Sequence, residues 1–154
     1  MSSTSAESFA RLLRLRAGSE PLRIEVAGSS MGRTIVSGSS VWVSATDRPR
    51  WGQIWAFCES GETVAVHRFV GRRDGCNRFW GDGNVSADAL VDDAFLIGRV
   101  VGIEAPTGGY RAMGTRAELT GACVVGARRL PRRVWWRARN LAARAMKRTR
   151  GQRG

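Results

Sequence analysis

Apolar residues recur with a helical period near the N-terminus and with a period of two after about residue 20. Phe9, Leu12 and Leu13 fall on one face of a helix over about 5–16. The next segment alternates apolar with charged side chains, which is typical of a half-buried strand. Its apolar positions are Leu22, Ile24 and Val26. The pattern therefore predicts a short N-terminal helix or arm over 1–20, followed by β structure.

Further strand-like runs follow, each separated from the next by a stretch rich in glycine or proline. They are 41–43, 54–57, 64–70, 78–80 and 95–103. No helical period lies between them. Short strands at this close spacing predict a mainly β fold, a coiled antiparallel sheet or small barrel, over residues 21–105.

The last third of the chain has a different character. Residues 106–128 are rich in glycine and weakly patterned, which indicates a linker or a terminal hairpin. Over 129–154 apolar residues return at helical spacing, and arginines occupy the opposite face. Pro131 stands near the start of this segment, where a helix tolerates proline. We therefore expect a basic amphipathic C-terminal helix.

The positive charge of the chain is confined to this last third. Residues 1–105 contain 12 arginines and 12 acidic residues, so they carry no net charge. Residues 106–154 contain 12 arginines, one lysine and a single acid, Glu118, and account for the whole net charge of +12. The sequence predicts a neutral domain with a basic appendage, and the two parts need separate explanations.

Several kinds of partner fit the basic appendage. A peripheral membrane helix through 129–150 would place Trp135 and Leu141 at the lipid boundary with arginines outward. Nucleic acid is the weaker alternative, since no base-reading motif is present. Otherwise the segment is a solvated tail or a docking helix for an acidic partner. No apolar run approaches the roughly 18 residues that cross a bilayer, and no signal peptide is recognisable, so we expect a cytoplasmic or membrane-peripheral protein.

Residue counts restrict the chemistry. The chain has one histidine, His67, one lysine, Lys147, and three cysteines. An odd number of cysteines without Cys-x-x-Cys spacing suits neither a disulfide framework nor a structural zinc site. A single histidine leaves only carboxylates as further ligands, so we expect no metal and no cofactor.

The most informative feature is a series of short motifs between residues 24 and 103. In chain order they are 28–35, 38–43, 52–57, 64–71, 81–88 and 97–102. In this order and spacing the series resembles the signal peptidase family of serine proteases, specifically its Ser–His, endoplasmic-reticulum-type branch. The resemblance covers residues 24–103, about half of the 154 residues, and implies the coiled antiparallel β fold of that family.

The resemblance implies a catalytic role for each of four residues. Ser30 stands where the family has its nucleophile, and His67 stands where the Ser–His branch has its general base. Other members use a lysine as the base, but the only lysine here, Lys147, lies far outside the motifs. Asp82 and Asp88 match the two acids of the family, one of which would orient the base.

These residue types also make chemical sense without the family. Near neutral pH a serine hydroxyl needs an adjacent base, and imidazole suits that task, while a carboxylate can hold the tautomer of the base. We expect the Ser30 backbone N–H and the Ser29 hydroxyl to bind the oxyanion. Gly28 would let an extended substrate strand approach, and Met31 belongs to the same oxyanion and substrate-binding segment.

Two residues depart from the family's pattern. Arg33 stands where the family usually has proline, and Ser39 stands where it usually has aspartate. Arg33 would reshape the loop around Ser30 or contact an acidic residue of the substrate. Taken singly, a serine in a Gly-Ser loop is usually a turn residue, and a histidine on an apolar strand is usually structural. Their joint spacing favours a catalytic pair.

We therefore expect a serine endopeptidase that cleaves a precursor peptide or protein with Ser30 and His67. The alternative is a catalytically inactive binding module of the same fold, recruited by its basic tail to a membrane surface or an acidic partner. We reject the related self-cleaving repressors, because they use a Ser–Lys pair and carry a DNA-binding domain upstream, and the 29 residues before Ser30 are too few for a helix-turn-helix domain.

Overall fold

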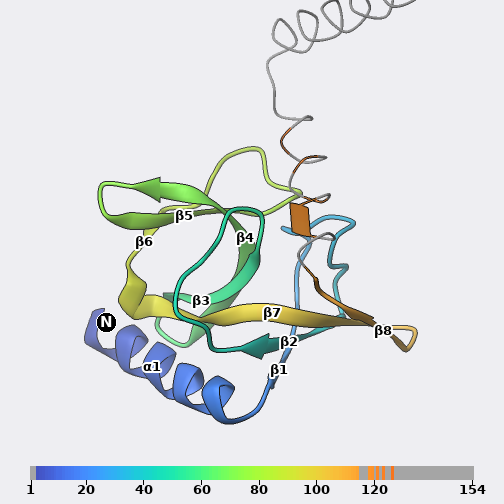
Figure 1. Cartoon of the computed structure of the whole chain (residues 1–154), viewed down its shortest axis with the longest axis horizontal. Helices are drawn as coiled ribbons and strands as arrows, with labels where there is room; N and C mark the ends of the chain where they lie inside the picture. Colours follow the sequence, from blue (N-terminus) through green and yellow to red (C-terminus); the bar gives the residue numbers. More distant parts are fainter. Residues whose placement is uncertain (1–2, 115–117, 120, 122, 124–125, 127–154) are drawn as a thin grey trace, which may run out of the picture. The chain divides into compact units, whose positions relative to one another are not determined.

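The computed structural model describes residues 3–114 together with 118, 119, 121, 123 and 126 (Figure 1). Helix α1 (Ser3–Ser19) comes first, and the segments after it are mostly strands. The strands are β1 (Leu22–Glu25), β2 (Ser40–Ser44), β3 (Ile54–Ser60), β4 (Thr63–Arg73), β5 (Cys76–Trp80), β6 (Leu90–Val91), β7 (Leu96–Ala105) and β8 (Gly109–Ala112). A short 3-10 helix, η1 (Asp93–Phe95), precedes β7.

The strands belong to one antiparallel sheet in the order β1-β2-β7-β3-β4-β5-β6, with β8 added beside β7. β7 is central, since it pairs with β2, β3 and β8. The predicted mainly β fold, with an antiparallel sheet and an N-terminal helix, is confirmed. Among the described strands the two at the ends of the order, β1 and β6, do not pair with each other, so the sheet stays open rather than closing into a small barrel.

The predicted strand-like runs correspond to β1, β2, β3, β4, β5 and β7. The pattern did not predict β6, which has only two residues. β8 forms a hairpin with the end of β7, one of the two alternatives for the glycine-rich segment. Residues 1–122 form one compact unit. The predicted basic helix over 129–154 lies outside the described residues.

Helix α1 buries a face of small side chains rather than the predicted face of large ones. Ala6, Ala10 and Ala17 are buried, and Ala10 belongs to the main core cluster. Leu12, predicted to share the buried face, is 63% exposed instead. Alanines let the helix axis lie close to the sheet, so packing favours them at the contact. Phe9 and Leu13 pack against the core from its border, as expected.

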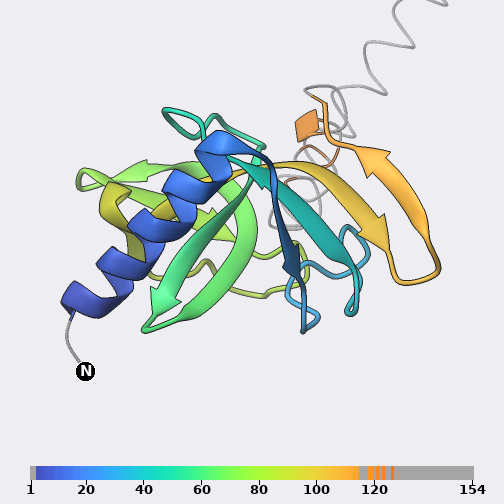
Figure 2. The same cartoon turned by 90° about the horizontal axis from the view of Figure 1, so that it is seen from below.

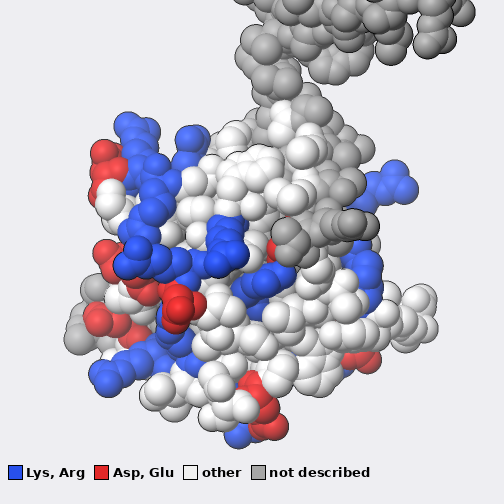
Figure 3. Space-filling model, in the orientation of Figure 1, with Lys and Arg blue, Asp and Glu red and all other residues white. Residues whose placement is uncertain are grey.

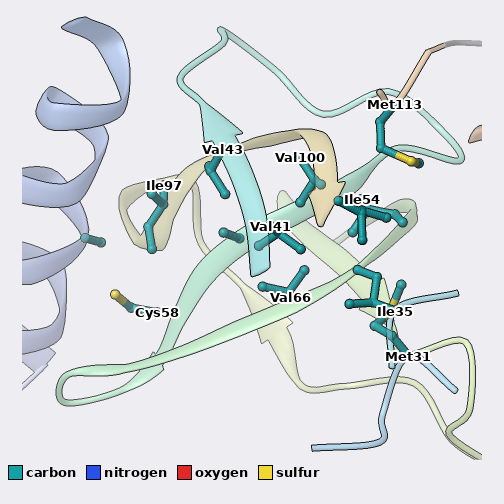
Figure 4. Packing of buried hydrophobic residues seen from close by; sticks show 13 residues of the cluster. Met31, Ile35, Val41, Val43, Ile54, Cys58, Val66, Ile97, Val100 and Met113 are labelled. Carbon is teal, nitrogen blue, oxygen red and sulfur yellow. The ribbon is translucent and has the colours of Figure 1, made fainter. Parts of the chain in front are cut away.

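The sheet encloses two clusters of buried side chains. The larger cluster includes valines and isoleucines from β2, β3, β4 and β7, and Figure 4 shows how they converge. The second is aromatic: Phe57 of β3 stacks on Phe79 of β5 with ring centroids 4.6 Å apart. Both faces of β3 are therefore covered, which explains the run of buried residues over most of its length.

Positive and negative side chains are mixed on the surface of this unit. Figure 3 shows arginines alternating with acidic residues on the face that it draws. At the hairpin of β4 and β5, Arg72 pairs with Asp93 and Arg73 pairs with Asp74. Exposed pairs of this kind contribute little to stability. They do neutralise one another, which agrees with the balanced charge of residues 1–105.

Candidate active site

Ser30 lies in the loop that joins β1 to β2, and two buried side chains fix this loop to the core. Met31 and Ile35 are each 1% exposed and point toward the larger cluster (Figure 4). The backbone turns twice in between, with Gly32 N–H donating to Ser29 O at 2.8 Å and Thr34 N–H donating to Met31 O at 3.0 Å. Burial of Met31 thus holds its neighbour Ser30 in place, half-buried at the surface.

His67 lies on β4, opposite Trp55 of β3, and brings Ser30 and Asp88 together. Its Nε2 atom is 2.8 Å from Ser30 Oγ, and its Nδ1 atom is 2.5 Å from Asp88 Oδ2. The imidazole is 9% exposed and the Asp88 side chain 13%. Residues 37 and 21 positions apart in sequence therefore form one hydrogen-bonded chain.

The two contacts of His67 determine which nitrogen carries the proton. An ionised carboxylate only accepts hydrogen bonds, so Nδ1–H donates to Asp88. Nε2 is then left to accept the hydroxyl proton of Ser30. This order of donor and acceptor lets a histidine deprotonate a serine.

Asp82, the other predicted acid, contacts Arg68 instead of the catalytic histidine. The guanidinium of Arg68 donates to both carboxylate oxygens of Asp82, at 2.8 and 2.6 Å. The hydroxyl of Thr34 also donates to Asp82, at 2.6 Å. Of the two acids that the sequence left open as the partner of the base, Asp88 contacts His67 and Asp82 contacts Arg68. Successive side chains of a strand point to opposite faces, so Asp88 at His67 and Asp82 at Arg68 bind on opposite sides of β4.

The turn that contains Asp82 packs directly against the backbone of Ser29 and Ser30. Gly83 N–H donates to Ser30 O at 2.8 Å. A Cβ atom at Gly81 would lie 2.5 Å from Ser30 O, and one at Gly83 would lie 3.0 Å from Ser29 O. A side chain at Gly81 would therefore force the Ser30 backbone to shift, and one at Gly83 would be in tight contact with the Ser29 backbone. Sequence reasoning gave these glycines no role beyond turn formation, although both belong to the quoted motif.

Arg68 and Thr34 are the other residues that sequence reasoning missed. Arg68 is 2% exposed and also donates to Gly52 O and Glu118 O. Arg68 donates to Asp82, and Asp82 also accepts a hydrogen bond from Thr34, which follows Ser30 by four residues. These contacts join β4 to the loop that contains Ser30. The signal was its position immediately after His67, but an arginine on a strand is usually assigned to the surface.

The remaining predicted residues lie around Ser30 at the surface. Gly28 and Ser29 are exposed, and Gly28 has a φ of 131°, which favours glycine. Its N–H donates to Ser37 Oγ at 3.3 Å. Arg33 is exposed two residues beyond Met31. The exposure of Ser29 and Arg33 does not test their expected roles. The oxyanion contact of Ser29 and the substrate contact of Arg33 therefore stay predictions.

Ser30, His67 and Asp88 line a groove of about 360 Å³ between two strand edges. One wall is formed by residues 24–27, and the other by residue 59 together with 63–66. Among the described strands, β1 pairs with β2 alone, and β4 begins its pairing with β5 only at Arg68. Figure 2 shows β1 (dark blue) and the green hairpin of β3 and β4 projecting toward the same side. Both walls thus present a backbone edge with unpaired groups.

Comparison with known proteins adds no assignment: no protein-family model matches this chain, and no curated protein sequence matches it. In the described part of the chain, no group of three His, Cys, Asp or Glu side chains is placed to hold a metal ion. Cysteines 58, 76 and 123 are free, and burial raises the pKa of the Cys58 thiol. None of the described helices is long and apolar enough to cross a membrane.

Proposed function

We propose that the protein is a serine endopeptidase of the signal-peptidase type, with Ser30 as nucleophile, His67 as general base and Asp88 as the acid that orients it. The observation that carries the proposal is the hydrogen-bonded chain from Ser30 Oγ through the imidazole to Asp88. The groove beside Ser30 supports it, because a nucleophile needs access to its substrate. The motif resemblance supports the same class of enzyme.

The geometry suits acyl transfer to a serine. A substrate strand binds extended in the groove and adds its backbone hydrogen bonds to the free edge of β1 or β4. Ser30 Oγ attacks the scissile carbonyl while Nε2 of His67 takes the hydroxyl proton, and Asp88 stabilises the imidazolium. The same proton then passes to the leaving amine. Water, deprotonated by His67, finally hydrolyses the acyl-enzyme and releases Ser30.

The substrate class we propose is a peptide or protein precursor, cut at a site that can enter the groove in extended form. The walls near Ser30 carry small and β-branched residues, among them Val26, Ala27 and Ala65. Walls of this kind suit small substrate side chains near the cleaved bond. The predicted oxyanion donors, the Ser30 N–H and the Ser29 hydroxyl, complete the proposed site.

A proteomic cleavage screen tests the proposal. The purified full chain and its Ser30→Ala and His67→Ala variants are incubated with a proteome-derived peptide library, and new termini are identified by mass spectrometry. We expect new termini with the parent alone, and with Ser86→Ala, a control that changes an exposed serine outside the groove lining. Equal cleavage by Ser30→Ala, or none by the folded parent, would contradict the proposal.

A second candidate is an inactive binding module of this fold, recruited to anionic membrane surfaces through residues 129–150. It is favoured by exposed Arg33 in the Ser30 loop and by the charge of the C-terminal segment, which has 11 basic residues and no acid over 128–154. Sedimentation with vesicles of anionic and of neutral lipid tests it. Binding to anionic vesicles without Ser30-dependent cleavage of any peptide would favour this candidate over the enzyme.

A further inference from the structure

The walls of the Ser30 groove carry two glutamates and, among the residues that the structure describes, no arginine or lysine. Glu25 stands on β1 and Glu59 stands at the end of β3, and both are exposed. None of the ion pairs formed between described residues involves either one. The two carboxylates therefore give the lining of the groove an acidic character.

Some other acids of the same unit are neutralised by arginines, whereas Glu7, Asp47 and Glu62 are exposed and belong to none of the ion pairs formed between described residues. Glu20 pairs with Arg16, and Glu104 pairs with Arg23. Asp88 in the groove is likewise occupied by His67. Glu25 and Glu59 thus remain available to a charged group that enters from solvent.

Both glutamates line the same groove as the reacting serine, and the position of Glu59 along β4 can be related to His67. Glu25 is the last residue of β1, and Ser30 follows it by five residues in the next loop. Glu59 lies at the register shift between Cys58 and Ser60, next to Thr63, and His67 follows Thr63 by four residues on β4. At about 3.3 Å per residue, Thr63 lies roughly 13 Å along β4 from His67, and this is the level of Glu59 in the groove. Substrate residues three to four positions from the scissile bond would lie at this level.

We infer that the groove selects substrates with an arginine or lysine three to four residues from the scissile bond, recognised by Glu25 and Glu59. The inference rests on the proposed peptidase function and names its substrate class. Complementary charge at a partly exposed site adds specificity and faster association more than raw affinity. Arginine is the better match, because its planar fork of donors binds carboxylates in pairs.

Binding and cleavage of the same peptides test this inference separately. The probes are alanine-rich decapeptides with a fluorescent label, carrying one Arg, Gln or Glu at each position in turn. Binding to the full-length Ser30→Ala protein is measured by fluorescence anisotropy, and cleavage by the parent is measured by mass spectrometry. At one position we expect Arg to improve binding about fivefold over Gln at low salt, and the gain to disappear at high salt.

Matched variants locate the effect. The double variant Glu25→Gln with Glu59→Gln removes the preference for Arg. Glu62→Gln, a control on the same hairpin but outside the groove lining, keeps it. Glu59→Arg shifts the preference toward the Glu peptide. Equal binding of Arg and Gln peptides, or an equal loss with Glu62→Gln, would overturn the inference.

The outcomes also separate this inference from the proposed function. Selective binding of Arg peptides that depends on Glu25 and Glu59, without cleavage by the parent, supports the acidic groove and contradicts the peptidase. Cleavage that depends on Ser30 but shows no preference at any position supports the peptidase and overturns the inference.

Discussion

Arg68 and Asp82 form a buried, two-point ion pair directly behind the Ser–His contact. Their side chains are 2% and 4% exposed, and both carboxylate oxygens of Asp82 accept hydrogen bonds from the guanidinium. Arg68 follows His67 on β4, while Asp82 holds Thr34 of the Ser30 loop. The pair therefore links the segment that carries the base to the segment that carries the nucleophile.

Removing one partner of this pair should destabilise the fold. Asp82→Asn leaves a buried guanidinium without its countercharge, so we expect a loss of about 3–5 kcal/mol in the free energy of unfolding. Urea denaturation measures it. Arg68→Met combined with Asp82→Asn should cost less than the two single losses added together. Arg73→Met, which breaks an exposed pair with Asp74, is the control and should change stability by less than about 1 kcal/mol. A similarly small effect of Asp82→Asn would show that the pair is not a structural link.

Asp88 should matter for turnover and not for folding. Asp88→Asn keeps the shape of the side chain but no longer fixes the proton on Nδ1 of His67, so kcat should fall on the order of 10⁴-fold, as it does for the orienting acid of serine triads. Peptide cleavage at saturating substrate measures kcat, and thermal unfolding measures the fold. Asp47→Asn is the control for the loss of one negative charge, because Asp47 is exposed and lies outside the groove lining. An unchanged kcat for Asp88→Asn would remove it from the catalytic group.

The sequence predicted which residues form the candidate site better than it predicted which of them contact one another. Ser30 and His67 could be matched because the motifs specify residue type, order and spacing. The choice between Asp82 and Asp88 could not be made, since both acids occupy one loop and differ only by six positions. The backbone contacts of the loop separate the two acids: next to Asp82, Gly83 N–H donates to Ser30 O, whereas Asp88 N–H donates to Phe79 O of β5.

Burial was harder to predict than strand position, for a related reason. Alternation located the strands, but the buried face of α1 consists of alanines, and Leu15, like Leu12, is exposed, at 66%. Glu118 was counted only as a lone acid in a basic region. In the fold it is 2% exposed and accepts a hydrogen bond from Arg99 at 2.9 Å. Such partners are distant in sequence, so no local pattern reveals them.

Gly81 should tolerate no side chain. Gly81→Ala would place a Cβ atom 2.5 Å from Ser30 O, so the Ser30 backbone must shift and the contact with His67 must lengthen. We expect activity to fall at least tenfold, together with a loss of about 1–3 kcal/mol in stability from overpacking. Gly109→Ala is the matched control, because no atom lies within 4 Å of its added Cβ and its φ is not positive. Equal activity of the two variants would mean that the turn does not support Ser30.

Asp93 should make the stability of the fold depend on acidic pH. A hydrogen bond from the Asn77 amide holds the pKa of this carboxyl below its usual range, with further help from Arg72 and Arg48. In the unfolded chain the group titrates near its ordinary value of about 3.9. Its stabilising contribution is therefore present above about pH 4 and is lost as the pH falls through the lower folded value.

Urea unfolding at pH 7, 5 and 3 measures this dependence. We expect the parent to lose more stability between pH 5 and pH 3 than Asp93→Asn, which cannot titrate at this position. The difference should be small, because the side chain is 57% exposed and solvent screens its contacts. Asp47→Asn, whose acid is exposed elsewhere on the unit, should keep the pH dependence of the parent. If the free energy of unfolding depends on pH equally in the parent and in Asp93→Asn, the contact with Asn77 does not lower the pKa of the Asp93 carboxyl. A group with the same pKa in the folded and unfolded states contributes no pH dependence.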